Sequence, residues 1–332
     1  MITVFTPAYN RAKFLPRLYE SLCRQTFKDF EWIVVDDGST DETAELFHLN
    51  ENVNDNEVSS CSPIFNFPLG PNGRLFRRSQ EFSIFNSFKV RYFYQENGGK
   101  HRAINRGVKE ARGELFFIAD SDDMLPTDAL EKVVKVYEDI KGDPTFAGVC
   151  GLDGTFDGKV IGSGLPEEVI DDNSIAVRFK LGVTGDMKEV FRTSVLKEFP
   201  FPEIEGERFC PEVLLWNRIA TKYKLRYFNQ IVYLAEYQDD GISAGIVKAR
   251  MTSPIASMMT YQEMTQYIDV PLKEKVKAAI NYWRFRCCAN QFSVFSFQFL
   301  GKKDKNIPTL KWWWNWVMPI GGAMHVKDSF SF

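Results

Sequence analysis

The chain has 332 residues and a formal net charge of −3, so it can bury a sizeable core and is not a strongly basic nucleic-acid binder. The charge is uneven, because residues 271–332 carry +7 and residues 1–270 carry −10. The six cysteines show no zinc-site spacing, which favours reduced thiols. No apolar run reaches the roughly 20 residues that a membrane-spanning helix needs. These features predict a cytoplasmic protein.

Two strand–turn–helix units open the chain. Residues 2–6 predict a short apolar strand, and residues 14–22 predict a helix with one apolar face. Residues 32–35 predict a second buried strand. Ser39 stands three residues before Glu42, which is the spacing of a capping box, so we expect a helix to begin there. Repeated alternation of strand and helix predicts a parallel sheet.

The alternation then breaks and resumes. Residues 48–88 are rich in Asn, Ser, Pro and Gly, and their weak periodicity favours an insertion or mobile loop. Residues 90–94 predict a third strand. The helix expected over about residues 100–111 ends at Gly113, a suitable residue just past a helix C-terminus.

The most informative stretch is an apolar run followed by acids. Leu115–Ala119 is typical of a strand buried on both faces, and Asp120-Ser121-Asp122-Asp123 follows at the end where open α/β sheets bind ligands. Clustered carboxylates repel one another, and a divalent cation such as Mg²⁺ or Mn²⁺ reverses that repulsion. The pattern predicts either a metal–diphosphate site or an acidic loop before a helix over residues 127–139, capped by Thr127.

Five motifs occur in a fixed order along the first part of the chain. They are Thr6-Pro7-Ala8-Tyr9-Asn10, Asp36-Asp37-Gly38-Ser39-Thr40-Asp41, Asn97-Gly98-Gly99-Lys100, Ala103-Ile104-Asn105-Arg106-Gly107 and Asp120-Ser121-Asp122-Asp123. As an ordered set they resemble glycosyltransferase family 2. The resemblance implies a GT-A fold, an α/β architecture with a mostly parallel, Rossmann-like sheet flanked by helices. It also implies sugar transfer from a nucleotide diphosphate with inversion.

The resemblance implies roles for particular residues. It implies that the nucleotide-sugar donor is bound by Thr6, Pro7, Tyr9, Asp37, Lys100, Asp120, Ser121 and Asp186. Asp122, together with Asp120, is implied to bind Mn²⁺ or Mg²⁺ in the manner of a DXD motif. Tyr237–Ser243 resembles a family loop near the nucleotide phosphates.

A second acidic position is a candidate for catalysis. Pro211–Arg218 resembles a family helix that opens with two acids, with Pro211 replacing the first of them. A carboxylate can remove the proton of an acceptor hydroxyl, so the resemblance makes Glu212 the general base, with Glu207 or Asp186 as substitutes. The alternative is a first-turn acid that only complements the helix dipole.

The expected organisation is a GT-A catalytic domain over residues 1–245 and a helical, aromatic and basic extension over residues 246–332. The catalytic domain divides at residue 126 into a nucleotide-binding half and an acceptor half. In the extension, aromatic residues recur at helical spacing from Tyr282 to Phe299, which predicts packing against the catalytic domain. Lys311–Met318 holds four tryptophans, and either a peripheral membrane anchor or a core or dimer contact explains them.

With the acidic loop, the resemblance implies a metal-dependent inverting hexosyl- or N-acetylhexosaminyltransferase. It further implies a UDP-sugar donor and a hydroxyl acceptor on a glycan or lipid-linked glycan, in cell-surface polysaccharide synthesis. One alternative is a sugar-phosphate nucleotidyltransferase, which would need a glycine-rich basic loop in place of Pro7–Asn10. The other is a non-catalytic nucleotide-sugar-binding protein. The expected location is the cytoplasm, with attachment to the inner face of the membrane through the Trp/Lys segment as a further option.

Overall fold

The structure is a computed structural model that describes residues 1–47, 79–83, 88–235, 245–289 and 308–329. The chain forms two compact units. The first unit comprises Met1–Asp171, Thr184–Glu198 and Leu225–Glu236, and the second comprises Asp172–Val183, Phe199–Lys224 and Tyr237–Phe332. Asp172–Val183 and Phe199–Lys224, which we expected in the catalytic domain, therefore lie in the second unit. The functional boundary at residue 245 stays a prediction.

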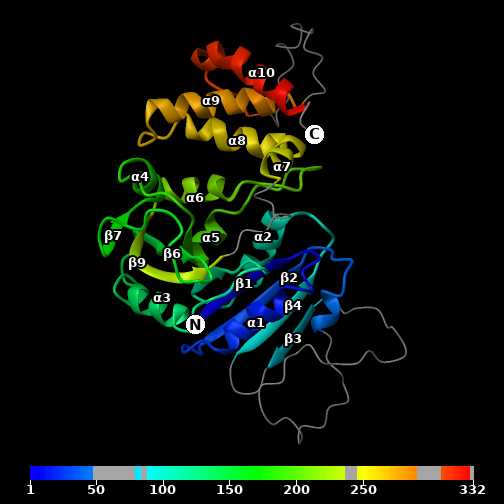
Figure 1. Ribbon diagram of the computed structural model, residues 1–332, viewed down its shortest axis with the longest axis vertical. Coiled ribbons are helices and arrows are strands. Elements are labelled where there is room, and N and C mark those ends of the chain that lie inside the picture. The colour runs from blue at the N-terminus through cyan, green and yellow to red at the C-terminus, as the bar shows by residue number, and fades with distance from the viewer. Residues whose placement is uncertain (48–78, 84–87, 236–244, 290–307, 330–332) are drawn as a thin grey trace, which may run out of the picture. The chain divides into compact units, whose positions relative to one another are not determined.

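The first unit is built on a sheet whose described strands follow the order β3-β4-β2-β1-β5-β8-β6-β9-β7 (Figure 1). The strands are β1 (Ile2–Ala8), β2 (Phe30–Asp36), β3 (Ser79–Ser83), β4 (Lys89–Tyr94), β5 (Leu115–Ile118), β6 (Phe146–Gly154), β7 (Val169–Asp172), β8 (Met187–Arg192) and β9 (Lys224–Leu234). Strands β4, β2, β1 and β5 are parallel, which confirms the predicted parallel sheet. Strands β3 and β8 pair antiparallel with β4 and β5, so the sheet as a whole is mixed.

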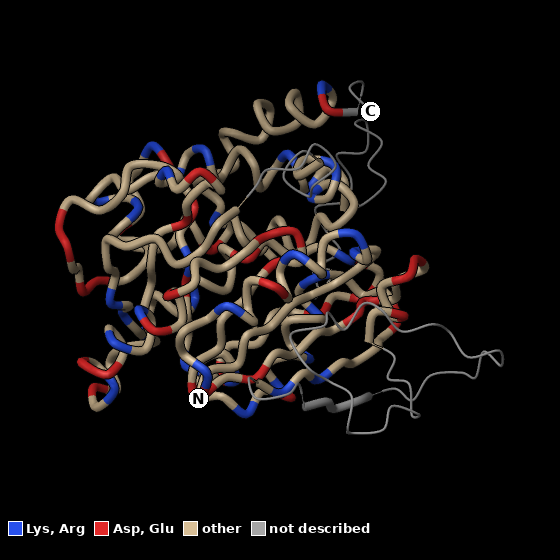
Figure 2. The backbone as a smooth tube through the Cα atoms, turned by 60° about the horizontal axis from the view of Figure 1, so that its bottom comes forward, with Lys and Arg blue, Asp and Glu red and all other residues tan. Residues whose placement is uncertain are grey.

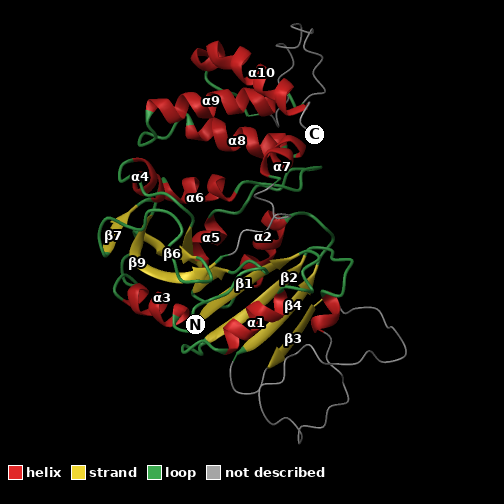
Figure 3. Cartoon of the chain, viewed as in Figure 1, coloured by secondary structure: helices red, strands yellow, loops and turns green. Residues whose placement is uncertain are grey.

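Helices cover both faces of the parallel strands (Figure 3). In the first unit they are α1 (Leu15–Cys23), the 3₁₀ helix η1 (Ala44–Phe47), α2 (Lys100–Glu110), α3 (Ala129–Glu138) and α5 (Thr193–Glu198). Neighbouring strand residues point to opposite faces. Val4 therefore shares a core with Leu18 of α1 and Leu130 of α3. On the other face, Phe5 meets α2 so closely that a Cβ at Gly107 would lie 2.2 Å from its ring.

The region after β2 differs from the prediction. Ser39 does not open a helix, because its hydroxyl accepts a hydrogen bond from the backbone N–H of Asn10 (2.9 Å) and helical structure begins only at η1. The predicted insertion over residues 48–88 contains a strand, because residues 79–83 form β3 beside β4. Residues 48–78 and 84–87 lie outside the described residues.

Two helix ends also differ from the prediction. Thr127 does not cap α3, which follows Asp128 and has no side-chain cap. Helix α2 ends at Glu110, before the predicted glycine. Gly113 is instead required by close packing, because its N–H donates to Thr3 Oγ1 (2.8 Å) and a Cβ there would lie 2.3 Å from the Thr3 nitrogen.

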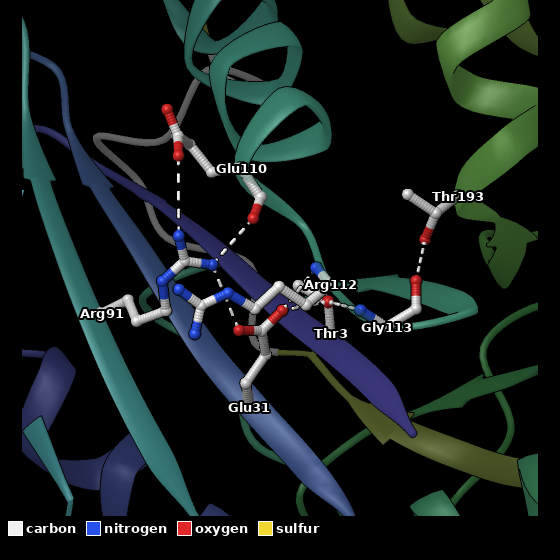
Figure 4. A network of polar contacts seen from close by, with 7 residues as sticks. All are labelled: Thr3, Glu31, Arg91, Glu110, Arg112, Gly113 and Thr193. Atoms are coloured by element: carbon white, nitrogen blue, oxygen red, sulfur yellow. Dashed lines mark hydrogen bonds and ion pairs between the residues drawn. The ribbon is translucent and has the colours of Figure 1, made fainter. Parts of the chain in front are cut away.

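A buried polar network joins the amino ends of the parallel strands to the end of α2 (Figure 4). Arg91 of β4 donates to the Glu31 carboxylate of β2 (3.2 Å) and to the carbonyl of Glu110 (2.7 Å). Glu31 Oε1 also accepts from Thr3 Oγ1 and from the backbone N–H of Arg112, both at 2.7 Å. Because a buried charge is costly without partners, this pairing ties α2 to the sheet.

The second unit is helical. Its described helices are α4 (Ser174–Phe179), α6 (Glu212–Ala220), α7 (Ile246–Thr252), α8 (Pro254–Met264), α9 (Leu272–Arg286), the 3₁₀ helix η3 (Trp312–Val317) and α10 (Met318–Ser329). Arg218 of α6 donates hydrogen bonds to both carboxylate oxygens of Glu263 of α8, at N–O distances of 2.6 and 3.0 Å. The geometry is the bidentate one that makes arginine–carboxylate pairs strong.

The aromatic residues of the extension pack within this unit. Tyr282 and Phe285 of α9 share a cluster with Met258 of α8. Residues 290–307, which hold the rest of the predicted aromatic stripe, lie outside the described residues. The described helices are all too short or too polar to cross a bilayer.

Candidate active site

Several of the predicted site residues lie where the parallel strands end. Strands β2, β1 and β5 are adjacent and parallel, so the chain leaves them at one edge of the sheet, into Tyr9, Asp37 and Asp120 (Figure 1). After β1 the chain builds outward to β2 and β4, and then returns to the other side of β1 as β5. This reversal is a topological switch point, the place where open α/β sheets bind ligands.

Asp37 organises the loop before α2. One carboxylate oxygen accepts from Gln95 Nε2 (2.7 Å) and from the backbone N–H of Gly98 (2.9 Å). The other accepts from the N–H of Gly99 (2.7 Å). Since Asp37 is buried, these donors replace water around its charge. The structure therefore shows Asp37 fixing the turn that presents Lys100, and its predicted contact with the base stays a prediction.

Asp120 and Lys100 form an ion pair at the edge. Lys100 Nζ lies 2.7 and 3.0 Å from the two carboxylate oxygens of Asp120. Burial alone would raise the pKa of Asp120, but the charges of Lys100, Lys188 and Arg11 and the lysine hydrogen bond lower it below its ordinary value. The backbone N–H of Asp120 donates to the hydroxyl of buried Tyr233 at 2.6 Å. Tyr233 thus fixes the first residue of the acidic loop.

Asp123 is the buried acid of the loop. Burial and the charge of Asp120 raise its pKa to about 7, although the charge of Lys188 opposes that rise. The Tyr233 hydroxyl also hydrogen-bonds to Asp123, which favours the ionised form, and the charge of Asp122 disfavours it. Lys188 lies beneath the loop, with Nζ 3.2 Å from the carbonyl of Ile118 and 3.3 Å from the centre of the Tyr233 ring.

Asp122 differs from its two neighbours. Its backbone carbonyl accepts a hydrogen bond from Arg17, whose guanidinium lies 4.5 Å over the ring of Phe156. Among the described residues its carboxylate has no hydrogen bond or ion pair. The described residues contain no group of three or more metal-ligating side chains. The Asp122 carboxylate is a hard oxygen donor of the kind that Mg²⁺ prefers, and Mg²⁺ often takes its other ligands from substrate phosphates and water.

Four other predicted donor residues differ in exposure. Thr6 is fully buried, and its hydroxyl accepts from Trp32 Nε1 (2.9 Å), so its side chain faces the core. Pro7 is half-buried and Ser121 is buried. Tyr9 is 47% exposed at the end of β1, and it is the aromatic residue among the four.

Asp186 is positioned by paired glycines. Gly162 and Gly185 have φ of +90° and +88°, and each lies so close to the other's segment that a Cβ would fall 2.0 Å from Thr184 O and 2.4 Å from Ile161 O. Side chains are excluded at both positions. Asp186 is exposed directly after this contact, at the start of β8.

Glu212 is the first residue of α6 in the second unit, directly after the N-cap Pro211. Glu212 is half-buried. Its position at the start of α6 fits both predicted roles, the general base and the acid that complements the helix dipole. Glu207 has a structural role instead, because its two oxygens accept from the backbone N–H groups of Ile255 (2.6 Å) and Ala256 (2.9 Å) and cap α8. The predicted phosphate loop Tyr237–Ser243 lies outside the described residues.

Three residues of the site escaped prediction, namely Lys188, Tyr233 and Arg17. Tyr233 is 113 residues from Asp120, and Lys188 is 70 residues from Ile118. Neither stands in a local motif, so only the pairing of β8 with β5 could have placed Lys188 beside the acids. The single hint was that Gly185-Asp186 precedes a strand.

The fold is the GT-A fold that solved glycosyltransferases have. A solved fragment of TarS from Staphylococcus aureus superposes with a TM-score of 0.53 at 18% identity, over 90% of this chain and 75% of that one. The same fragment in complex with UDP-GlcNAc gives a TM-score of 0.53 at 16% identity, over 86% and 81% of the two chains.

Sequence comparison is more specific. Residues 3–51 and 78–149 match the family Glycosyl transferase family 2. Glycosyltransferase GlyG of Streptococcus pneumoniae is 25% identical over 70% of each chain. TarS of S. aureus, a poly(ribitol-phosphate) β-N-acetylglucosaminyltransferase, is 24% identical over 83% of this chain. The chain spans only 43% of TarS and 27% of the S. pneumoniae glycosyltransferase GlyA. The residues that match this family contain all five ordered motifs, which agrees with the resemblance predicted from the sequence.

Proposed function

We propose that this chain is a metal-dependent inverting glycosyltransferase that takes an N-acetylhexosaminyl or hexosyl group from a UDP-sugar. The acceptor is a hydroxyl of a glycan or lipid-linked glycan in cell-surface polysaccharide synthesis. The observation that carries this proposal is the open carboxylate of Asp122 beside the Lys100–Asp120 pair at the switch point. The likeness to TarS, whose name and solved complex specify N-acetylglucosamine and UDP-GlcNAc, supports the choice of donor.

Asp122 would hold Mn²⁺ or Mg²⁺ at this edge. When bound, the ion binds the donor diphosphate and stabilises the charge that develops on the departing nucleotide. Lys100 and Lys188 both add positive charge near Asp120, and positive charge favours phosphate oxygens. Tyr233 keeps the loop in one conformation by accepting from Asp120 and hydrogen-bonding to Asp123, which limits the reorganisation needed on binding.

The donor's base and ribose would lie against Tyr9 and the turn that Asp37 fixes. Tyr9 offers an exposed ring for stacking. Asp37 already accepts three hydrogen bonds from protein donors, so a base N–H would add to an ordered carboxylate rather than to a mobile one. This pre-organisation lowers the entropy cost of binding.

Glu212 is the proposed general base. It would take the proton of the acceptor hydroxyl as that oxygen attacks the anomeric carbon, while the bond to the nucleotide diphosphate breaks on the opposite face. A single displacement of this kind inverts the anomeric centre. Glu207 is a weaker candidate, because a base must be free to receive a proton and both oxygens of Glu207 cap α8. Asp186 remains the substitute.

Two alternatives are less well supported. A sugar-phosphate nucleotidyltransferase would need a basic glycine-rich loop after β1, where this chain has Pro7-Ala8-Tyr9-Asn10. A non-catalytic binding protein would bind the donor without turning it over.

Turnover by a Glu212→Gln variant tests the proposal. We expect the parent to release UDP from UDP-GlcNAc with Mn²⁺ and a panel of oligosaccharide acceptors, and the variant to lose roughly 10²- to 10⁴-fold in kcat. Glu205→Gln is the matched control, because Glu205 is an exposed acid of the same unit. The base assignment fails if Glu212→Gln transfers sugar as fast as the control. The absence of turnover in the parent, with donor binding intact, would favour the binding protein.

A further inference from the structure

The last described segment, which comprises η3 and α10, exposes several large apolar side chains. Trp312, Trp313 and Trp316 of η3 are 77%, 49% and 63% exposed, and Met318, Ile320 and Val326 of α10 are also exposed. We call these six residues the tryptophan face. A surface helix of a soluble protein normally shows the opposite pattern, with its apolar stripe against the core.

The opposite side of the same segment packs against α9. Trp314 and Val317 are buried against Ala279, and a Cβ at Gly321 would lie 2.6 Å from the carbonyl of Ile280. Further along, the Asp328 carboxylate turns inward and pairs with Arg284, with an N–O distance of 2.7 Å.

His325 also turns inward, with Nδ1 3.4 Å from the sulfur of Cys288. The polar side chains near the end of α10 therefore lie against α9. The tryptophan face is held outward by this packing, so its exposure is a property of the fold rather than of a loose end.

The charged side chain in contact with the tryptophan face is a lysine. Lys311 and Lys327 are both exposed, and Lys311 Nζ lies 5.1 Å from the centre of the Trp313 ring. Between residues 308 and 328 the only carboxylate is Asp328, which Arg284 already neutralises. Figure 2 shows the last helix uncharged until its final residues.

These features distinguish between possible occupants of the face. In a two-fold dimer the same patch meets itself, so Lys311 would approach the same positive patch of the second copy. An anionic lipid surface instead offers negative charge to Lys311. Indole rings favour the headgroup region, where an apolar ring and a polar N–H are both accommodated.

We propose that the tryptophan face docks the second unit on the surface of a bilayer that contains anionic lipid. The segment lies in the interface plane and does not cross the membrane, because neither η3 nor α10 is long enough to span it and α10 contains the inward polar side chains described above. The inference goes beyond the proposed transfer reaction and does not depend on it.

Vesicle flotation with the full chain tests this inference. The probes are vesicles of pure phosphatidylcholine and vesicles with 30% phosphatidylglycerol. We expect the parent to float with the anionic vesicles, and Trp312→Ser/Trp313→Ser/Trp316→Ser to lose binding at least tenfold. Lys311→Glu/Lys327→Glu should weaken binding to anionic vesicles about tenfold or more, and added salt should weaken the parent.

The control is Val160→Ser/Val169→Ser, which removes exposed apolar side chains from the first unit and should float like the parent. Thermal melting of each variant shows whether it is folded, and a variant that melts early is replaced by Trp312→Leu/Trp316→Leu. The inference is overturned if the parent floats with neither vesicle, or if the folded tryptophan variant floats as well as the parent. It is equally overturned if sedimentation shows a dimer that the tryptophan substitutions dissociate while vesicles are ignored.

Discussion

Asp123 lowers the free energy of unfolding by an amount that depends on pH. Burial and the neighbouring Asp120 charge raise its pKa from 3.8 to about 7. The folded state therefore holds a proton between these values that the unfolded chain releases, so the free energy of unfolding falls as the pH rises from about 4 to about 7. At about 1.4 kcal/mol per pKa unit, the loss is on the order of 4 kcal/mol.

We expect Asp123→Asn to flatten this dependence. Urea unfolding at pH 5 and pH 8 in EDTA should show the variant gaining stability over the parent at the higher pH. Asp128→Asn removes a half-exposed carboxylate nearby and should follow the parent. Parallel pH profiles for all three proteins would contradict the burial argument.

At the scale of single residues, the sequence predicted what lies in local motifs. Asp37, Lys100 and Asp120 were predicted together, and the structure brings Lys100 and Asp120 into contact. Lys188 and Tyr233 could not be predicted, because their place depends on strands that join the sheet from much later in the chain. Thr6 was predicted as a pocket residue, but strand alternation turns its side chain to Trp32.

At the scale of elements, α2 is held at both ends. Asp37 accepts the N–H groups of Gly98 and Gly99 just before the helix, and Arg91 binds the carbonyl and carboxylate of Glu110 at its end. Helix α2, which presents Lys100 to the acidic loop, is therefore also fixed at its C-terminal end, near the amino ends of the parallel strands.

The variant Arg91→Met tests the contact between Arg91 and the end of α2. It leaves Glu31, which is 2% exposed, without its cationic partner, so we expect a loss of about 3–5 kcal/mol in the free energy of unfolding by urea. Arg106→Met is a matched control, because Arg106 pairs with the same Glu110 from the surface (2.9 Å), where such pairs contribute about 0–1 kcal/mol. Equal losses in the two variants would show that the buried Arg91 pair contributes no more to stability than the surface Arg106 pair.

The elements were predicted better than their ends. Apolar periodicity predicted α1, β2, β4 and β5, because burial on a helix or strand face repeats along the sequence. The caps at Ser39 and Thr127 were wrong, because a hydroxyl can bond to any nearby donor. Ser39 bonds to Asn10, which is 29 residues away in the chain.

At the scale of the whole molecule, the parallel half of the sheet follows from strand–helix alternation. The antiparallel insertion of β8 next to β5 does not, because the irregular sequence around Gly185 contains no alternation. The division into two units was also hidden, because the second unit takes up two separate segments before the extension.

The central claim is that Asp122 holds a divalent cation against the donor diphosphate. Thermal melting with UDP, with and without Mn²⁺, tests it most directly, since a ligand at 100 times its Kd stabilises by about 2.7 kcal/mol. We predict that UDP with Mn²⁺ raises the Tm of the parent and of Asp128→Asn by several degrees, reversibly with EDTA, and that Asp122→Asn loses the Mn²⁺-dependent part. An Asp122→Asn variant that keeps the full Mn²⁺-dependent rise would contradict the account.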